Sequence, residues 1–593
     1  MDTELFGVLD DGSAFDSLAG EREFDRVVEG EAVTVGVRDD ALGQPGRTSI
    51  ETTDAGVAVV WGEAFVPTHF DGSAAAWLLD AFQTHGIDAF DGLNGSYLAV
   101  VEHDDRVAIT SDPIRSWECF TASAAVVEAA VDGDGNESID GRVFGSDAAS
   151  VARTIESPTI DPQGIAEFLY LGGTLNHRTP IRELDRLLLD HALTRDGSVQ
   201  LDRYRHRAAT GPAGRDGDRD HDRDRDHAEV LARRLERAIN RRNTASEAVD
   251  GRSHAALLSA GFDSRLLLAC RDDVDTTYTV GPTGSDEVAV AGQLAARYGA
   301  EHVHLPTDGR YLDRDETAIR ATNGVKESLH VHHAGYTDAI DADAISHGLL
   351  LDTLLRGYFL PRETTEVAGL TIPRGPLDAN PDPLTHLTGI MGYLPATADL
   401  IPRTPGLDAG SDEAFLDDSI GAAYRECADR ATDEYAAFER FGVQNVLATP
   451  FRTHLADQYT ESLVAADAGL VDWHLQTPPA VRTEATFRDA LRRIDADILD
   501  PRPPDRPHDS FFANQVEKRL RQSIPGLEPF DAPWPDRRTA YADQNLDGRI
   551  LLDRPDLHGY PPRFKLRIRD LRQWLRLATD GTVSVDEALP VPE

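Results

Sequence analysis

The first third of the chain has the hydrophobic pattern of a strand-rich domain. Residues 56–62 and 95–102 are β-branched runs with flanking glycines, and each predicts a strand. Residues 104–112 begin with two aspartates and continue as an apolar run, which predicts a turn and the second strand of a hairpin. A helix is expected between the first two strands, from Ala74 to His85.

After about residue 228 strands alternate with helices, which is typical of a parallel sheet with crossover helices. A helix begins near Arg265, and a second runs to Tyr298 with Ser285 as its N-cap. Four strands are predicted, at residues 254–258, 276–280, 302–305 and 344–348. Beyond about residue 415 the chain is expected to be mostly helical, with amphipathic stretches at 463–475 and 485–494.

Residues 211–227 separate the two patterns. They have no apolar periodicity and alternate in charge almost residue by residue, so they cannot bury enough surface to offset their ordering entropy. A metal site formed by His221 and His227 among the aspartates is the alternative, but a solvated linker is favoured. We therefore expect a first domain over residues 1–210, a charged linker over 211–227 and a second domain over 228–593.

The composition narrows the classes of partner. The net charge is −44, and Lys326, Lys518 and Lys565 are the only lysines among 59 basic residues. Such a composition resembles that of proteins from salt-loving archaea, where salt screens self-repulsion; a strongly acidic mesophile protein is the alternative. Nucleic acid is an unfavourable partner, because phosphate binding needs clusters of lysine and arginine.

The N-terminus lacks the pattern of a signal peptide, and no apolar stretch is long enough to span a membrane. Cys119, Cys270 and Cys427 are scattered and form neither a CxxC pair nor a disulfide framework. We therefore expect a cytoplasmic protein without a membrane partner.

The most informative segment is Ser259-Ala-Gly-Phe-Asp-Ser264, which lies between a predicted strand and a predicted helix. The first amides of a helix are unpaired and carry the positive end of its dipole, so this loop is suited to an anion. Gly261 permits close approach of a phosphate, and the hydroxyls of Ser259 and Ser264 can donate to it. Asp263 would repel phosphate unless Mg²⁺ lies between them.

The segment does not match a Walker A loop. It resembles instead the Ser-Gly-Gly-x-Asp-Ser loop of the ATP pyrophosphatase (PP-loop) enzymes. Those enzymes cleave ATP between the α and β phosphates and adenylate a carboxylate or a similar group.

Further segments resemble the asparagine synthetase family in collinear order. Residues 347–358 are similar to its segment Ser-Gly-Glu-Gly-x-Asp-Glu-x-x-x-Gly-Tyr. Other similar segments lie at residues 93–101, 111–116, 161–172, 179–184, 279–302, 467–478, 487–492 and 506–511. The resemblance implies an α/β protein: an N-terminal Ntn-type αββα sandwich, like that of class II glutamine amidotransferases, followed by a PP-loop (HUP-like) parallel-sheet synthetase domain with a helical C-terminal lobe.

The resemblance also implies the site. It implies ATP and Mg²⁺ as cofactors, with Asp263 and Asp352 as metal ligands. His508 falls near the family's phosphate-neutralising lysine, and Arg506 is a second cation beside it; ordinary loop residues are the alternative. The implied ATP-binding residues are Leu258, Ser259, Gly261, Asp263, Ser264, Val280, His347 and Gly348.

The chain departs from the family at residues that do chemistry. A class II glutaminase uses an N-terminal cysteine, but Asp2 follows Met1 and the nearest cysteine is Cys119. The first domain is therefore expected not to hydrolyse glutamine. Leu349 and Thr353 stand where the synthetase domain of the family has glutamates.

These observations favour an ATP- and Mg²⁺-dependent amide-forming ligase that adenylates a small carboxylate and takes nitrogen from ammonia or an amine. A catalytically inactive nucleotide-binding or scaffold descendant is the first alternative, and an ammonia-dependent asparagine synthetase is the second. A homodimer is compatible with the sequence. His330, His332 and His333 suggest zinc, but the sequence specifies no further ligand.

Overall fold

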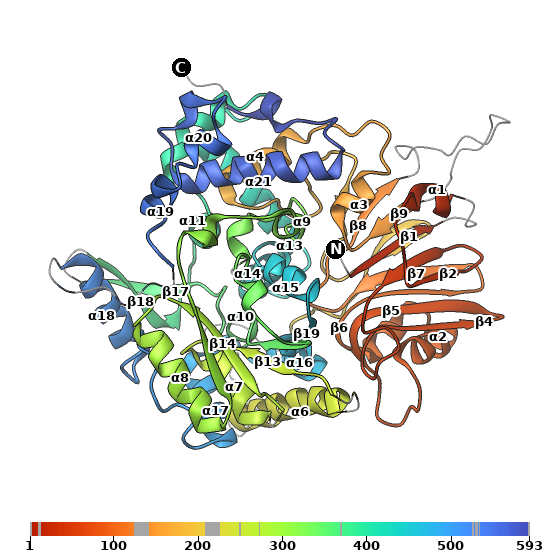
Figure 1. The fold of residues 1–593 in the computed structure, drawn as a ribbon, viewed down its shortest axis with the longest axis horizontal. Helices are drawn as coiled ribbons and strands as arrows, with labels where there is room; N and C mark the ends of the chain where they lie inside the picture. Colours follow the sequence, from red (N-terminus) through yellow and green to blue (C-terminus); the bar gives the residue numbers. More distant parts are fainter. Residues whose placement is uncertain are drawn as a thin grey trace.

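The structure, a computed structural model, is a mixed α/β protein with two antiparallel sheets and a five-stranded parallel sheet (Figure 1). The residues that it describes are 3–9, 14–123, 142–207, 226–247, 249, 251–271, 273–331, 333–367, 370–524, 527, 530, 532 and 534–590. In this described part of the chain, no helix combines the length and apolar character needed to cross a membrane.

Two antiparallel sheets of six strands form the first part of the chain. Their strand orders are β10-β8-β9-β1-β3-β2 and β12-β11-β7-β6-β5-β4. The predicted hairpin is confirmed, because β6 and β7 pair antiparallel. The strands are β1 (Glu4–Leu9), β2 (Arg26–Glu29), β3 (Thr34–Arg38), β4 (Ser49–Thr53), β5 (Gly56–Phe65), β6 (Asn94–His103), β7 (Arg106–Ser111), β8 (Phe120–Ser123), β9 (Arg142–Gly145), β10 (Asp185–Arg186), β11 (His191–Thr194) and β12 (Gly197–Gln200).

Apolar residues occur at successive positions of several of these strands, and successive side chains point to opposite faces, so each sheet buries apolar residues on both faces. In β5, Val57 and Val59 join the core between the two sheets, whereas Ala58 and Val60 face helix α2 (Ala74–His85). Helix α3 (Ala148–Ala152) contacts β8 and β9 on the outer side of the other sheet. The layers are thus helix, sheet, sheet and helix.

The second part contains a parallel sheet with the strand order β15-β14-β13-β16-β19. The four strands predicted from the sequence are present, and β19 is a fifth. The prediction of a helix over 463–475 is therefore wrong at its start, because β19 ends at Leu463 and helix α16 begins at Ala468. The strands are β13 (His254–Leu257), β14 (Thr276–Gly281), β15 (Glu301–Pro306), β16 (Ala344–His347) and β19 (Thr460–Leu463).

Helices cover both faces of this sheet. Ala256 and Leu258 pack towards α8, whereas Ala255 and Leu257 pack towards the C-terminal helices. Ser285 caps α8 as predicted, accepting from the amide of Val288. The helices nearest the sheet are α6 (His227–Glu247), α7 (Phe262–Cys270), α8 (Asp286–Tyr298) and α17 (Glu484–Ile494).

Most of the predicted linker, 211–227, lies outside the described residues, and its last residue, His227, begins helix α6. The C-terminal region is helical apart from β19. Its elements and those before it include α9 (Glu316–Arg320), α10 (Leu351–Leu355), α11 (Pro383–Ile390), α13 (Ala422–Ala428), α14 (Glu434–Asn445), α15 (Thr449–Ala456), α18 (Phe511–Ser523), α19 (Arg537–Asp543), α20 (Asp547–Ile550), α21 (Pro562–Ala578) and the hairpin of β17 (Arg362–Val367) with β18 (Leu370–Leu377).

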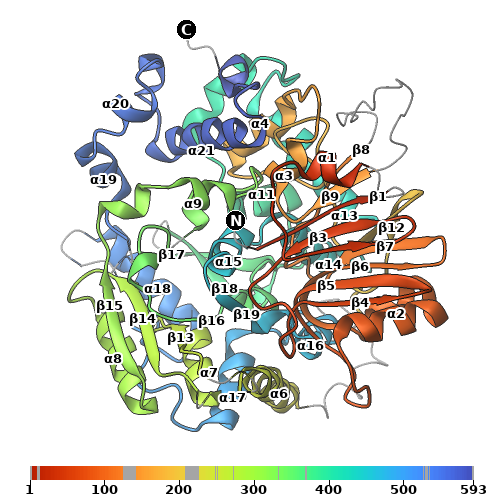
Figure 2. The same ribbon diagram turned by 45° about the vertical axis from the view of Figure 1, so that its right-hand side comes forward.

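One apolar core joins the two parts of the chain. Phe168 and Leu171 of helix α4 (Pro162–Leu171) belong to the same buried cluster as Trp574 and Leu575 of α21. Figure 2 shows α21 lying against α4, beside α3 and the antiparallel sheets. The first part therefore packs on the C-terminal helices over a continuous apolar surface.

Candidate functional site

The loop 259–264 connects β13 to α7 and is held together by its own serines. The hydroxyl of Ser264 donates to the carbonyl of Ser259 at 3.0 Å and accepts from the Ser259 amide at 3.0 Å. The amide of Gly261 donates to the Ser259 hydroxyl at 3.1 Å. Gly261 is the N-cap of α7 and provides no side-chain cap, so the first amides of the helix remain directed at the loop's open side.

Gly348, at the end of β16, lies directly against this loop. A Cβ atom at Gly348 would lie 2.8 Å from both the carbonyl carbon and the Cβ of Asp263. The next turn contains Leu350 in the left-handed region, with φ of 67°, which is uncommon for a residue with a side chain. Only glycine therefore allows the two loops to meet as closely as they do.

Replacing Gly348 with alanine is expected to weaken Mg·ATP binding about tenfold to a hundredfold, because the two loops must move apart. Titration calorimetry measures the affinity, and a melting curve checks that the variant folds. Gly410→Ala is the matched control, since no atom lies within 4 Å of its added Cβ. Unchanged affinity in Gly348→Ala would show that this contact does not shape the site.

The two loops meet where the strand order reverses. β14 and β15 lie on one side of β13, whereas β16 and β19 lie on the other. In open parallel sheets, ligands bind beyond the carboxyl ends of the strands at such a switch point. The residues predicted to bind ATP all lie at this edge, from three neighbouring strands: Leu258, Ser259, Gly261, Asp263, Ser264, Val280, His347 and Gly348.

The two predicted metal ligands are joined by an arginine. The Nη2 atom of Arg356 lies 3.0 Å from Oδ2 of Asp263 and 3.3 Å from Oδ2 of Asp352. Sequence reasoning missed Arg356. The available signal was its position four residues after Asp352 on α10, a spacing at which side chains pair on a helix.

Asp263 retains one oxygen that could hold a cation. Its side chain is 20% exposed, and its Oδ1 atom is buried with no hydrogen-bond partner among the described residues. Burial raises the pKa of Asp263 to about 6, although Arg356 opposes this shift. A buried carboxylate oxygen without a partner, next to an arginine that also holds a second carboxylate, suits a hard cation such as Mg²⁺. The residues therefore fit Mg²⁺. Arg356 and a bound cation would compete for the same two carboxylates.

The structure brings Arg506 to the loop but not His508. The guanidinium carbon of Arg506 lies 5.3 Å from the ring centroid of Phe262, the first residue of α7. Nη1 of Arg506 lies 3.6 Å from Oε2 of Glu484. His508 instead places Nε2 2.6 Å from Oε2 of Glu517 on α18, and its side chain is 48% exposed. Of the two predicted cations, Arg506 is the one that lies next to the loop 259–264.

His347 connects the loop to the first part of the chain. Its Nε2 atom lies 2.8 Å from Oε1 of Glu461, and Nε of Arg452 lies 3.0 Å from Oε2 of the same residue. Arg452 also donates to the carbonyl of Ser116 at 2.8 Å and lies over the ring of Trp117. Burial opposes ionisation of Glu461, but Arg452 and His347 outweigh it and lower its pKa to about 2. Sequence reasoning missed this chain of contacts because it joins distant segments.

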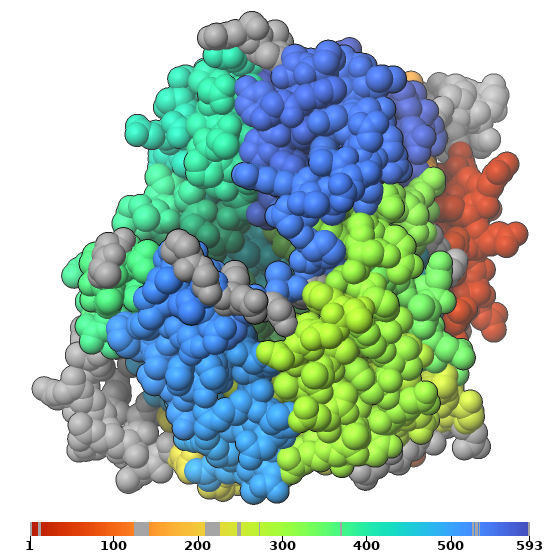
Figure 3. Space-filling view, turned by 60° about the vertical axis from the view of Figure 1, so that its left-hand side comes forward, coloured from red at the N-terminus to blue at the C-terminus, as the bar shows by residue number. Residues whose placement is uncertain are grey.

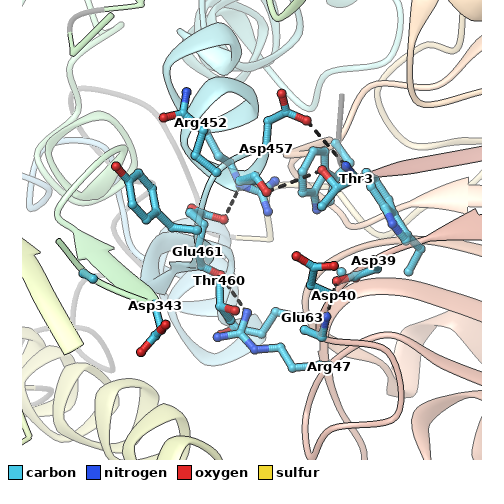
Figure 4. Close-up of a pocket in the computed structure, with 18 of the residues that line it drawn as sticks. Thr3, Asp39, Asp40, Arg47, Glu63, Asp343, Arg452, Asp457, Thr460 and Glu461 are labelled. Carbon is cyan, nitrogen blue, oxygen red and sulfur yellow. Dashed lines mark hydrogen bonds and ion pairs between the residues drawn. The ribbon is translucent and has the colours of Figure 1, made fainter. Parts of the chain in front are cut away.

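A cavity of about 290 Å³ lies between the antiparallel sheets and the parallel sheet (Figure 4). Thr3, the first described residue, lines it, and its amide donates to Asp457 at 3.4 Å. Several of the charged groups that line it pair with one another; Nη2 of Arg47, for example, lies 3.7 Å from Oε1 of Glu63. Met1 and Asp2 lie outside the described residues. Cys119 is buried, and burial raises the pKa of its thiol to about 12, so it is no thiolate nucleophile.

Two histidine groups do not form convincing metal sites. His206, His474 and Glu439 converge in the interior, but Arg482 pairs with both oxygens of Glu439 and already balances its charge. Of the predicted cluster, His332 lies outside the described residues. His330 lies 3.8 Å from Glu327, whereas His333 packs on the ring of Phe451.

Comparison with known proteins gives little further guidance. No protein-family model matches the sequence, and no curated protein matches it. Among solved structures, glutamine phosphoribosylpyrophosphate amidotransferase from B. subtilis matches with 12% identity, a TM-score of 0.18 and coverage of 58% of this chain and 68% of that one. A structure described as the allosteric regulatory enzyme of purine biosynthesis matches with 10% identity, a TM-score of 0.18 and coverage of 60% and 70%. Such TM-scores are too low to carry an argument about function.

Proposed function

We propose that this protein is an ATP- and Mg²⁺-dependent amide-forming ligase of the asparagine-synthetase type. The supporting observation is the junction at the switch point of the parallel sheet, where Gly348 seats against Asp263 at the start of α7. That junction combines a helix start suited to an anion, two carboxylates that share Arg356, and a neighbouring cation, Arg506.

The proposed reaction has two steps. A carboxylate oxygen of the substrate attacks the α-phosphorus of ATP, the bond to the bridging oxygen of the β-phosphate breaks, and pyrophosphate leaves. A nitrogen then attacks the carbonyl carbon of the acyl adenylate, AMP leaves, and a proton passes to solvent. The loop amides would bind the phosphates, and Arg506, which lies over Phe262 at the start of α7, would balance the charge on the departing pyrophosphate.

Asp263 and Asp352 would hold Mg²⁺, which when bound neutralises phosphate charge and orients the leaving group. Arg356 keeps the two carboxylates together by contacting both. A guanidinium is always charged, so Arg356 can turn to a phosphate oxygen when the carboxylates have another partner. Together the two carboxylates and Arg356 carry one negative charge in excess, which a bound cation would offset.

The nitrogen in this proposal is free ammonia or a substrate amine. Burial raises the pKa of each of the three cysteines, Cys119, Cys270 and Cys427, to about 12. A thiolate that attacks glutamine is therefore not available from them.

One observation favours the rival reading, a nucleotide-binding descendant without catalysis. Arg356 already pairs with both predicted metal ligands, and an inactive protein could retain these contacts as a structural ion-pair cluster. An ammonia-dependent asparagine synthetase is a narrower form of the main proposal, but Leu349 stands where the family has a glutamate.

Pyrophosphate release from Mg·ATP tests the proposal on the full chain, with a panel of carboxylic acids and ammonium. We expect release that depends on both an acid and ATP, and no stimulation when glutamine replaces ammonium. Calorimetric binding of Mg·ATP without release for any acid would favour the inactive descendant. Release triggered by aspartate above all other acids would identify the asparagine synthetase activity.

A further inference from the structure

A second cavity, of about 220 Å³, lies beyond the end of β15, where the chain meets the C-terminal helices. Its walls come from the turn that follows β15, from the segment around Glu327 and from the starts of α19 and α21. The loop 259–264 does not line it. Figure 3 shows this side of the molecule: the C-terminal segment, in blue, lies against the yellow-green segment that contains β15, and the surface between them is hollowed. We call this cavity the β15 pocket, and its principal lining residues are Tyr311, Arg314, Glu327, Trp534, Arg537 and Arg563.

Two of the arginines that line the β15 pocket have no acidic partner. Arg314 donates from Nε to the carbonyl of Ser328 at 3.1 Å and from Nη1 to the carbonyl of Asp313 at 2.9 Å. Arg537 interacts with the hydroxyl of Tyr311, and its Nε atom is buried without a hydrogen-bond partner among the described residues. In that part of the chain, no carboxylate oxygen lies within 4.0 Å of either guanidinium. Because the chain has 103 acidic residues, two such guanidiniums beside one cavity call for an explanation.

The acids that adjoin these two arginines in the sequence are engaged elsewhere. Oδ1 of Asp313 lies 3.6 Å from Nη1 of Arg549. Asp315 is the N-cap of α9 and Asp536 is the N-cap of α19, and each accepts a hydrogen bond from a backbone amide of its helix. These carboxylates therefore do not serve as counterions inside the pocket.

Glu327, the acidic residue that lines the β15 pocket, is also already paired. Its carboxylate accepts from Nε of Arg563 at 3.0 Å and from Nε of Arg567 at 2.9 Å. Burial opposes ionisation of Glu327, but the two arginines outweigh it and lower its pKa. His330 lies 3.8 Å from the same carboxylate. Glu327 therefore leaves the charges of Arg314 and Arg537 without compensation.

The surroundings of Arg314 disfavour its positive charge. Burial, and after it the neighbouring Arg569, lowers the pKa of the Arg314 guanidinium to about 10, although Asp570 opposes this shift. Asp570 is itself held by Arg569, whose Nη2 lies 2.8 Å from its Oδ1. An anion beside Arg314 would remove this electrostatic cost.

Aromatic side chains form another wall of the β15 pocket. The rings of Tyr311 and Trp534 stack with centroids 5.3 Å apart and planes inclined by 26°. The hydroxyl of Tyr311 donates to the carbonyl of Pro535 at 3.0 Å, which fixes the ring. Such walls exclude water and strengthen a hydrogen bond between a guanidinium and an anion. A volume of about 220 Å³ suits a small ion rather than a nucleotide.

We propose that the β15 pocket binds a small dianionic oxyanion, held by Arg314 and Arg537. Two guanidiniums without acidic partners match two negative charges, and the planar guanidinium group pairs with phosphate and carboxylate oxygens alike. Inorganic phosphate and a short dicarboxylate share this chemistry. The bound anion would join the turn after β15 to the start of α19, so it is expected to stabilise the folded protein. This site does not depend on the proposed ligase function.

Calorimetric titration of the full chain with phosphate and with malonate tests the β15 pocket, in potassium chloride that keeps the ionic strength constant. We expect saturable binding of at least one of the two anions and a rise in Tm on binding. Arg537→Gln and Arg314→Gln are each expected to weaken this binding at least about tenfold, because each removes a charged donor. Arg538→Gln is the matched control, because Arg538 is exposed, follows Arg537 on α19 and does not line the pocket. A melting curve without anion checks that each variant folds, and Arg537→Gln alone decides the test if Arg314→Gln does not.

The two anions distinguish the source of the ligand. Binding of phosphate alone supports a phosphate-type ligand, and binding of malonate alone supports a short dicarboxylate. Binding of neither anion would overturn the proposal. So would unchanged affinity in Arg537→Gln, which would place the anion elsewhere, for example at the loop 259–264. An equal loss of affinity in Arg538→Gln would also overturn it, because the anion would then respond to net charge rather than to the pocket.

Discussion

Asp263→Asn is expected to abolish acid-dependent pyrophosphate release, by about a thousandfold or more, while stabilising the metal-free protein. The loss follows from removing a charge of the loop 259–264 that the proposal assigns to the metal ion. The gain follows because the Asp263 carboxylate is buried, with Oδ1 unpartnered among the described residues. Arg356 keeps Asp352 as its partner in the variant, so no cation is stranded.

The raised pKa of Asp263 determines how the free energy of unfolding changes with pH. The pKa of Asp263 is raised from 3.8 to about 6 in the folded protein, so ionisation lowers stability as the pH rises between these values. Asparagine removes this cost, and above pH 6 the variant should gain about 2 kcal/mol in its free energy of unfolding. Denaturant titrations at pH 4 and pH 8 measure the difference.

Two companion variants sharpen this test. Asp352→Asn should also lose activity but change stability little, because the side chain of Asp352 is 40% exposed. Asp202→Asn, at a side chain 76% exposed, should alter neither property. Full activity in Asp263→Asn would contradict the metal-ligand role, and a destabilised variant would show that its ion pair with Arg356 outweighs its burial.

Glu461→Gln is expected to destabilise the protein by about 3–5 kcal/mol at neutral pH, because it leaves Arg452 buried without a countercharge. The pKa of Glu461 is lowered from 4.5 to about 2 in the folded protein. Its stabilising contribution is therefore complete above pH 4.5 and is lost as the pH falls towards 2. The glutamine variant should lack this component of the acid transition.

The exposed pair of Asp417 and Arg425 provides the control for Glu461. Both side chains are more than half exposed, so Asp417→Asn should cost at most about 1 kcal/mol. Urea unfolding at pH 7 and pH 4 compares the variants. Equal, small effects at both positions would show that the contacts joining His347, Glu461 and Arg452 are not a stabilising unit.

The elements that sequence patterns predicted well are those with apolar residues on a regular period. The runs at β5, β6 and β14 are rich in valine, alanine, threonine or tyrosine, and each is bounded by glycine or a charged turn. The loop 259–264 was recognisable because its strand and helix are adjacent in sequence. Its position between neighbouring strands then followed from the parallel sheet.

The features that were missed depend on contacts between distant segments. β19 reads Thr-Glu-Ser-Leu and lacks an apolar period, because Glu461 and Ser462 are buried by pairing with His347 and Glu63, which are far away in sequence. Arg356 acquires its role only when α10 meets α7. His508 matched a family position by spacing alone, and its actual partner, Glu517, lies on the following helix.

The apolar core shared by α4 and α21 ties the first part of the chain to the C-terminal helices. Deleting that part would expose the partners of Phe168 and Leu171 on the C-terminal helices, so selection for solubility alone would retain it. The two parts should also unfold together, in a single calorimetric transition, because neither can lose the shared core independently.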